Sequence, residues 1–369
     1  MAATLSPLPP LYARWMRECL AGDIPSEPKA TCHDCAMCRA PAEVAPANDA
    51  VFFDPRSKCC TYMPVLWNFL VGALLDDDSA EAAAGRRTVE ARIAAGVAVT
   101  PLALERPPAY SVLYSHILEA FGRAQSMRCP HYLEEAGGLC GVWRARESTC
   151  ATWFCKHERG AVAKRFWEEL HRLLQVTERE VATWCVAELD VGTEALAAIF
   201  PFPTRPPGPV TGADFDGEAT PERRKLVWGK WAGREQAFYR EAGRLAGALS
   251  WADVVSLGGA EVRTAVQLTE AAFEKFTTPR LPERLRARSF RLTPTPLGGA
   301  LAAAYSPADP LELSPEVLEI LSYFDGRSTR AARQTIAREL GYAVDTALLL
   351  KLVDFGVLED ALTPHRPPG

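Results

Sequence analysis

The sequence has no long uninterrupted hydrophobic run, and this lack limits where the chain can reside. The longest apolar run, Met63–Leu75, is interrupted by Asn68 and is too short to span a bilayer. The N-terminal stretch MAATLSPLPPLYARW lacks the basic segment and apolar core of a signal peptide. The net charge of −5 gives no general attraction to nucleic acid or anionic membranes. We therefore expect a cytoplasmic protein without a membrane span.

Several catalytic motifs are absent as well. The chain contains no GxxxxGK[ST] phosphate loop, no HExxH zinc-protease motif and no GxSxG nucleophile elbow. A CxxCxxC triplet at Cys32, Cys35 and Cys38 differs from the CxxxCxxC spacing of radical-SAM enzymes, and the chain is not a run of βα units. These absences leave no recognised catalytic motif, so whether the protein is an enzyme is an open question at this stage.

Cysteine, in contrast, is abundant and clustered. The 369-residue chain has 11 cysteines, and nine of them group in loops: Cys32, Cys35, Cys38, Cys59, Cys60, Cys129, Cys140, Cys150 and Cys155. Disulfide frameworks are typical of small secreted domains, and a bridge between neighbouring residues strains the peptide that joins them. Thiolates separated by two residues suit a shared metal instead. The grouping therefore predicts metal binding.

The number of clustered thiols limits the number and kind of metal sites. Nine thiols exceed one four-ligand site and nearly match two. We predict one or two [4Fe–4S] clusters, with zinc as the alternative. Cys19 and Cys185 fall within helical apolar patterns and are expected to be core residues.

Charged and aromatic residues around the thiols leave several roles open. Three histidines border the cysteines and could be ligands, partners of ligands or surface residues: His33, His131 and His157. Three nearby arginines could lower the pKa of a thiol and so activate a nucleophile, but are more typical of ion-pairing surface groups: Arg144, Arg146 and Arg159. Trp228, Trp231, Phe238 and Tyr239 have the helical spacing of a core face, although a nucleic-acid stacking platform is the alternative.

The cysteine pattern resembles a known family. The CxxCxxC triplet, the Cys59–Cys60 pair and the stretch CPHYLEEAGGLCGVWRARESTCATWFC are similar to the YkgJ-like cysteine-cluster proteins, described as a zinc- or iron-chelating domain. The resemblance extends to the cysteine region of flagellin lysine N-methylases and covers about residues 30–160. It implies these metal ligands: Cys32, Cys35, Cys38, Cys59, Cys60, Cys140, Cys150 and Cys155, with Cys129 as the ninth. The sequence departs from the family in two places, because the double cysteine does not adjoin Cys38, and Trp143, Arg146 and Glu147 replace a Tyr and an Arg-Pro.

Periodicity predicts a mainly α fold with an irregular, cysteine-rich, metal-stabilised core, a helical bundle and a small winged-helix-like C-terminal domain. The expected domains are residues 1–200 with the cysteines, a Pro/Gly linker at 201–219, a helical segment at 220–290 and the C-terminal domain at 291–369. Among the expected helices are Tyr62–Leu75, Ala80–Ala95, Tyr110–Arg123, Ala161–Leu174 and Thr177–Leu189.

The C-terminal domain is expected to bind a protein or peptide. Its three predicted helices end at turn glycines, and the segment weakly resembles a PqqD-like peptide-binding module. Residues 307–369 carry six basic against ten acidic side chains, a net charge of −4, which disfavours DNA binding. The predicted groove-reading helix offers only Lys351 among leucines.

Together these observations predict an iron–sulfur or zinc protein that acts in electron transfer, metal handling or maturation of a partner. An enzyme that uses the cluster to modify a protein or peptide, as the methylase resemblance implies, is the alternative. A metal- or redox-sensing DNA-binding regulator is a third and weaker hypothesis.

Overall fold

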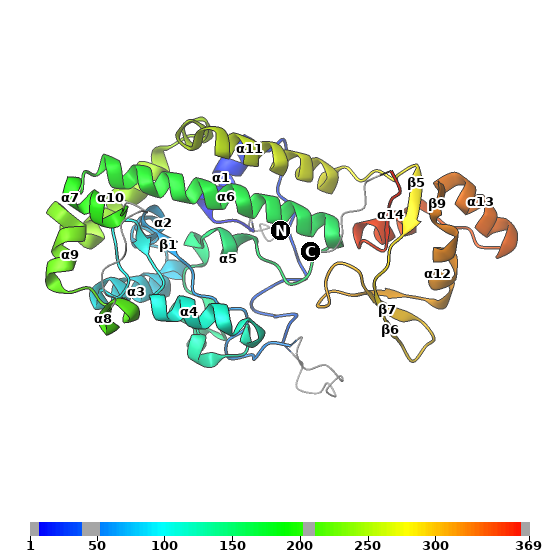
Figure 1. The fold of residues 1–369 in the computed structure, drawn as a ribbon, viewed down its shortest axis with the longest axis horizontal. Helices are drawn as coiled ribbons and strands as arrows, with labels where there is room; N and C mark the ends of the chain where they lie inside the picture. The colour runs from blue at the N-terminus through cyan, green and yellow to red at the C-terminus, as the bar shows by residue number, and fades with distance from the viewer. Residues whose placement is uncertain (1–6, 39–51, 202–210, 363–369) are drawn as a thin grey trace. The chain divides into compact units, whose positions relative to one another are not determined.

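The computed structural model describes residues 7–38, 52–201 and 211–362, and it divides into two units (Figure 1). The first unit comprises Met1–Ser26, Thr31–Trp153 and Leu170–Gln267. The second comprises Glu27–Ala30, Phe154–Glu169 and Leu268–Gly369. The chain passes from one unit to the other within two long helices, α6 (Gly160–Glu188) and α11 (Trp251–Thr277). Residues 202–210 of the predicted linker lie outside the described residues.

The first unit is predominantly helical, which confirms the mainly α prediction. Besides its parts of α6 and α11 it contains α1 (Pro10–Cys19), α2 (Asn68–Leu75), α3 (Ala80–Ala95), α4 (Pro108–His116), α5 (Ser148–Thr152), α7 (Thr193–Ile199), α8 (Gly212–Asp216), α9 (Pro221–Trp228) and α10 (Glu235–Ala248). Two antiparallel pairs of short strands accompany them: β1 (Leu66–Trp67) with β2 (Ala103–Leu104), and β3 (Tyr132–Leu133) with β4 (Leu139–Cys140).

The core of the first unit forms where α2 packs against α10. The backbones approach so closely that a Cβ on Gly72 would lie 1.8 Å from the Tyr239 carbonyl oxygen. Glycine is therefore required at this crossing, because any side chain would force the helices apart. Trp228, Phe238 and Tyr239 are fully buried beside it, as expected for a core face, whereas Trp231 is half-buried. Cys185 is buried against the same helix, with its thiol 3.7 Å from the Ala242 carbonyl oxygen, as predicted for a core cysteine. The same prediction is wrong for Cys19, which is half-buried near the end of α1.

Helix α3 carries the surface on which the cysteine loops rest. Its first turn is capped by Ser79 Oγ, which accepts a hydrogen bond from Ala82 N at 3.3 Å, and Gly96 ends it in a left-handed conformation. Both bounds agree with the predicted helix. A Cβ on Gly85, in the middle of α3, would lie 1.9 Å from the Gly141 carbonyl oxygen. The loop that follows Cys140 therefore sits directly on the helix backbone.

Three helix predictions differ from the structure. The helix expected over 62–75 begins only at Asn68, because Leu66 and Trp67 pair with β2. The helix expected over 110–123 ends at His116, since Ile117 leaves the helical region with φ −123° and ψ 37°. The two helices expected between 161 and 189 are one, α6, because no Gly or Pro interrupts the chain there.

The second unit combines two antiparallel sheets with short helices. Its strands are β5 (Arg284–Ala287), β6 (Arg291–Pro294), β7 (Ala300–Ala303), β8 (Leu311–Leu313), β9 (Asp325–Ser328) and β10 (Leu358–Asp360), in the orders β10-β5-β9 and β6-β7-β8. Its helices are α12 (Pro315–Ile320), α13 (Thr329–Glu339) and α14 (Thr346–Asp354). A buried cluster that includes Leu285, Phe324, Ile336, Leu349 and Leu352 joins them.

In the part of the chain that is described, no helix has both the length and the apolar character needed to cross a membrane.

Candidate metal centre

Eight of the nine predicted ligand cysteines belong to the first unit and come together there from separate segments: Cys32, Cys35, Cys38, Cys59, Cys60, Cys129, Cys140 and Cys150. We call these eight residues the thiol cluster. Cys59 is central, because its thiol raises the pKa of four others: Cys32, Cys38, Cys129 and Cys140. Cys35 and Cys60 act on Cys59 in the same way, and Cys140 acts on Cys150. The fold thus gathers thiols that the sequence separates.

Six thiols of the cluster have raised pKa values and so favour the protonated form when no metal is bound: Cys32, Cys38, Cys59, Cys129, Cys140 and Cys150. Burial raises the pKa of Cys32 and Cys140 to about 11 and that of Cys129 to about 12. Neighbouring thiols add to this rise, because two thiolates close together repel each other. A cation bound among them would remove that repulsion, since metals bind the thiolate form.

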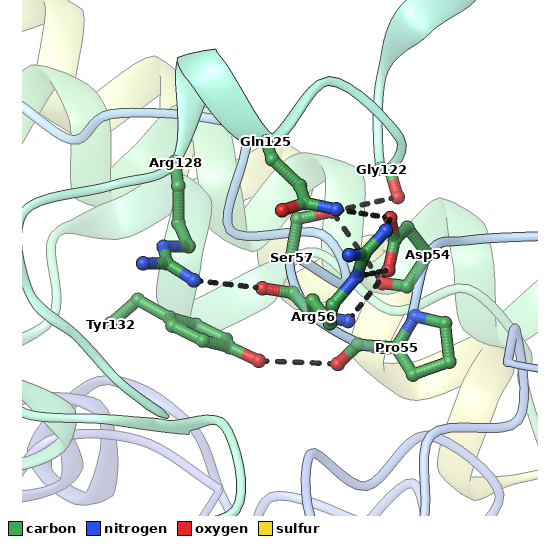
Figure 2. A network of polar contacts seen from close by, with 8 residues as sticks. All are labelled: Asp54, Pro55, Arg56, Ser57, Gly122, Gln125, Arg128 and Tyr132. Carbon is green, nitrogen blue, oxygen red and sulfur yellow. Dashed lines mark hydrogen bonds and ion pairs between the residues drawn. The ribbon is translucent and has the colours of Figure 1, made fainter. Parts of the chain in front are cut away.

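A polar network around Asp54 fixes the segment that leads into Cys59 and Cys60 (Figure 2). Asp54 accepts hydrogen bonds from Arg56 N at 2.8 Å, from the Arg56 guanidinium at 3.0 Å and from Gln125 Nε2 at 2.8 Å. These donors lower the pKa of Asp54 to about 2. Ser57 Oγ donates to the Gly122 carbonyl oxygen at 3.1 Å. The turn before Cys59 is therefore tied to the loop that precedes Cys129.

Further contacts bring the two cysteine segments together. Tyr132 donates from its hydroxyl to the Pro55 carbonyl oxygen at 3.2 Å, as Figure 2 shows. Beyond the network, Cys129 N donates to the Cys60 carbonyl oxygen at 2.7 Å. The β3–β4 hairpin then places Cys140 opposite Tyr132. Its turn contains Gly138 at φ 77°, where a Cβ would lie 2.2 Å from the Tyr132 hydroxyl, so only glycine fits.

Lys58 joins three loops of the thiol cluster through a single buried ammonium group. Its Nζ donates to the carbonyl oxygens of Cys32 at 2.6 Å, Gly137 at 3.0 Å and Gly138 at 3.0 Å. Only 8% of the residue is exposed. Its backbone adopts a left-handed conformation, with φ 51°, which is uncommon for a residue with a side chain. The ammonium charge lowers the pKa of the Cys32 and Cys38 thiols against the effect of burial.

Two arginines add positive charge to the cluster. Arg146 is 5% exposed and donates to the carbonyl oxygens of Trp143 at 3.0 Å, Cys150 at 3.3 Å and Pro7 at 2.7 Å. Arg92 donates to the Glu105 carbonyl oxygen at 2.6 Å, while its Nη1 is buried with no hydrogen-bond partner among the described residues. Arg146 favours the ionised thiols of Cys32 and Cys140, and Arg92 favours that of Cys129.

Lys58 and Arg146 are buried and Arg92 is half-buried, and all three lack a carboxylate counter-charge among the described residues. Within the described ranges, none of Lys58, Arg92 and Arg146 forms an ion pair with a carboxylate. Their hydrogen bonds go to backbone carbonyls, which are dipoles and carry no net charge. A buried charge is costly unless an opposite charge accompanies it. The groups close enough to provide negative charge are the thiols, if they ionise.

His131 lies between Cys129 and Cys140 in the chain and is fully buried. Its backbone N–H donates to Cys129 Sγ at 3.4 Å, and its carbonyl oxygen accepts from Gly141 N at 2.8 Å. Its ring Nδ1 lies 2.8 Å from Thr88 Oγ1 on α3. Burial, followed by the charge of Arg92, lowers the pKa of His131 to about 3. The imidazole is therefore neutral.

The short helix that carries Cys150 is anchored by two buried glutamates. Glu147 accepts hydrogen bonds from Cys150 N at 3.0 Å and Thr149 N at 2.8 Å. Glu178, on α6, accepts from Tyr12 Oη at 2.5 Å and from Ser148 N at 2.5 Å. Ser148 Oγ lies 2.6 Å from Glu178 Oε2 and 3.3 Å from Glu147 Oε2. A hydroxyl has one proton, so both contacts are hydrogen bonds only if one of the two carboxyl groups is protonated.

Glu178 is expected to make stability depend on pH. Burial, followed by the nearby Glu147, raises the pKa of Glu178 from 4.5 to about 8. A carboxyl whose pKa is higher in the folded state binds more protons in the folded than in the unfolded protein. Its stabilising contribution to the free energy of unfolding is therefore complete below pH ~4.5 and is lost as the pH rises toward ~8. In Glu178→Gln, the free energy of unfolding should fall less between pH 5 and 8 than in the wild type, measured by urea denaturation at each pH (~5 and ~8). Exposed Glu188 of the same helix provides the control, since Glu188→Gln should keep the wild-type slope. Equal slopes in all three proteins would contradict the assignment.

The remaining predicted site residues fall in different places. Cys155 and His157 belong to the second unit, where His157 N donates to Asp309 Oδ2 at 3.1 Å, and His33 is exposed. Arg144 and Arg159 form the expected ion pairs, with Asp77 and Asp354, each at 2.6 Å. The expectation of a surface ion pair is wrong for Arg146, because backbone carbonyls enclose its guanidinium.

The thiols are neighbours, but they do not yet converge on one point. As the side chains stand, no group of three or more His, Cys, Asp or Glu residues in the described ranges could hold a metal ion. Metal binding would therefore require the cysteine side chains to lose their protons and turn toward a common centre.

Sequence reasoning missed Lys58, Arg92 and Thr88 as parts of this site. Lys58 directly precedes the Cys59–Cys60 pair, and that adjacency was the one local signal available. Arg92 and Thr88 lie on a helix without cysteines, so nothing in their sequence neighbourhood links them to the thiols.

Comparison with known proteins does not add a family to this picture. No family model, no curated protein and no solved structure matches the chain. The candidate function therefore depends on the chemistry of the site itself.

Proposed function

We propose that the thiol cluster binds a thiophilic metal centre, with iron–sulfur as the first choice and zinc as the alternative. The observation that carries this proposal is the presence of three cations around eight thiols, two of them buried (Lys58 and Arg146) and one half-buried (Arg92), without carboxylate partners among the described residues. A metal bound by four thiolates is a net anion, both for a [4Fe–4S] cluster and for zinc. Such an anion would neutralise the cations, whereas eight protonated thiols leave them uncompensated.

The donor set fits this chemistry. Eight thiols equal two complete sets of four, as in two [4Fe–4S] clusters or two zinc sites. An iron–sulfur cluster would supply one-electron transfer, and zinc would stabilise the loops that hold it. The YkgJ-like resemblance implies the same residues together with Cys155, and it gives Cys129 as the ninth ligand. The role of Cys155, which belongs to the second unit, stays a prediction from the sequence.

The protein would serve electron transfer, metal handling or maturation of a partner. In this proposal the irregular loops around the thiols form a metal-stabilised core, since ligand loops with few apolar contacts gain folding free energy from the metal. The arrangement of α13 and α14 beside the β10-β5-β9 sheet supports a winged-helix-like C-terminal module.

The expected protein or peptide partner also stays a prediction. On the second unit, a cavity of about 500 Å³ lies beside α13, and its lining suits a peptide partner. Arg330 and Arg333 lie in it next to the apolar Leu281 and Val344. A segment that carries both acidic and apolar side chains would match this lining.

Metal content tests the proposal directly. Purified without oxygen, the protein should be brown, with iron and sulfide in matching amounts of about four or eight per chain. Colourless protein with about one or two zinc ions would support the zinc alternative. Protein that contains neither metal, and takes up neither iron with sulfide nor zinc after reduction, would contradict the proposal.

A pair of cysteine variants separates ligand loss from general damage. Cys140→Ala removes a thiol of the cluster and should lose one metal centre, measured as metal per chain. Cys185→Ala removes a fully buried thiol from the α6–α10 contact and should keep the wild-type metal content. Equal metal content in both variants would remove Cys140 from the ligand set.

A further inference from the structure

The hydrogen bonds around His131 determine which of its ring nitrogens carries the proton. Thr88 Oγ1 lies 2.8 Å from the Gly85 carbonyl oxygen and 2.8 Å from His131 Nδ1. The carbonyl can only accept, so the single hydroxyl proton of Thr88 is donated to Gly85. The threonine oxygen must then accept from His131, which places the imidazole proton on Nδ1. Nε2 is left with an unprotonated lone pair.

That lone pair has no partner within the described residues. Nε2 is buried and makes no hydrogen bond there. Water cannot serve as its partner at the surface, because the residue as a whole is 0% exposed. Buried polar atoms almost always have a partner, and a bound metal ion is one of the groups that account for an exception. An unprotonated imidazole nitrogen held in one orientation by a hydrogen bond on the opposite nitrogen is the usual form of a histidine metal ligand.

The backbone of His131 connects this residue with the thiol cluster. The residue is two positions from Cys129, whose sulfur accepts its N–H, and its carbonyl oxygen holds Gly141, the neighbour of Cys140. Mixed sets of thiolates with one imidazole are common at zinc sites, and imidazole replaces thiolate on some iron–sulfur centres.

We propose that His131 Nε2 is a nitrogen ligand of the metal centre that Cys129 and Cys140 help to hold, with Thr88 as the residue that positions it. This inference rests on the proposed metal-binding function. It adds a histidine, and a helix outside the cysteine loops, to a predicted ligand set of thiols for which the role of the bordering histidines was left open. The other histidines that border the cysteines, His33 and His157, are assigned no such role.

Cadmium binding tests the assignment without the native metal or any activity. The apo protein, labelled with 15N-histidine and reduced, is titrated with 113Cd²⁺ alone and followed by NMR. We expect a 113Cd resonance that is split by coupling to one imidazole nitrogen, because scalar coupling requires a bond between cadmium and that nitrogen. The splitting should disappear in His131→Ala while cadmium stays bound through sulfur. It should persist in His33→Ala and His157→Ala.

Each alternative outcome has a definite meaning. Cadmium bound by sulfur with no nitrogen coupling in the wild-type protein would overturn the role of His131 and leave the proposed metal-binding function intact. Coupling that survives in His131→Ala would assign the ligand to another histidine and also overturn the inference. Failure to bind cadmium, with all thiols reduced, would overturn both. Because the wild-type spectrum decides the first point, the test does not depend on whether His131→Ala folds.

Thr88→Val separates positioning from ligation. Valine has a similar shape but cannot accept the Nδ1 proton, so the imidazole should no longer be held in one tautomer. The 113Cd–15N coupling should weaken or split into two populations, while the sulfur-bound cadmium signal remains. An unchanged coupling would show that Thr88 does not position the ring.

Discussion

Replacing Lys58 with methionine is expected to destabilise the first unit by about 2–4 kcal/mol and to abolish retention of the metal. Methionine has nearly the same length but cannot donate, so the carbonyl oxygens that Lys58 bonds, including the buried Gly138 oxygen, lose their donor. A buried acceptor without a partner costs about 1–3 kcal/mol. The variant keeps a side chain at φ 51°, so the backbone cost is the same in both proteins and the difference isolates the ammonium group.

Loss of the Lys58 charge should affect the metal as well as the fold. The ammonium favours ionised Cys32 and Cys38, and the three loops that it joins carry Cys32, the Cys59–Cys60 pair and the hairpin to Cys140. Stability is measured by urea denaturation and metal by content per chain. Lys230→Met is the control, because that exposed lysine pairs only with the exposed Asp190 and should change stability by less than about 1 kcal/mol. A Lys58→Met protein with wild-type stability and metal content would show that the cation is dispensable.

Gly85→Ala is expected to reverse the usual effect of this substitution in a helix. Alanine in place of glycine normally stabilises a helix interior by about 0.5–1 kcal/mol. At Gly85, however, the new Cβ would lie 1.9 Å from the Gly141 carbonyl oxygen, an overlap that forces the loop away from α3. Overpacking of this kind costs about 1–3 kcal/mol, and here it also displaces the loop that follows Cys140. We therefore expect a net loss of stability together with reduced metal content.

Gly247 on α10 provides the matched control for Gly85. A Cβ at Gly247 would meet no atom within 4 Å, so Gly247→Ala should be neutral or stabilising by up to about 1 kcal/mol. Both variants are compared by thermal or urea unfolding in the same metal state. Should Gly85→Ala be as stable as Gly247→Ala and retain its metal, the cysteine loop would not depend on close contact with α3.

The three cations near the thiols share one kind of hydrogen-bond partner. Lys58, Arg92 and Arg146 use backbone carbonyls as hydrogen-bond acceptors, and these bonds leave their charge available. A carboxylate partner would neutralise that charge and reduce its effect on the thiols. In the proposed function, the metal–thiolate group takes the place of the carboxylate.

Several features of the fold could be predicted from local sequence. Helix α3 was expected with the correct bounds, because the Ser79 cap and the Gly96 turn are local signals. The helix expected over 62–75 was too long, since pairing of Leu66 with Leu104 depends on a strand that is distant in the sequence. The split of α6 into two helices was wrong, because a change in apolar pattern does not end a helix unless a breaking residue is present.

In the candidate site, too, some residues could be predicted from local sequence and others could not. The nine cysteines were identified from their spacing, which needs no tertiary information, and the same is true of the histidines beside them. The surroundings of Arg146 were misjudged, because a charged residue between polar neighbours resembles a surface position until the carbonyls of Pro7 and Cys150 are seen to enclose it.

By itself, the sequence determined that this protein is mainly helical and predicted that clustered thiols carry its chemistry, because helix periodicity, caps and cysteine spacing act over a few residues. Only the tertiary structure decided which cysteines share an environment, that Lys58 joins loops as far as 80 positions away, and which nitrogen of His131 lacks a proton. These properties depend on contacts between segments that are remote in the chain. Burial then fixes their consequence, since it is the absence of water that makes an unpaired charge or lone pair costly.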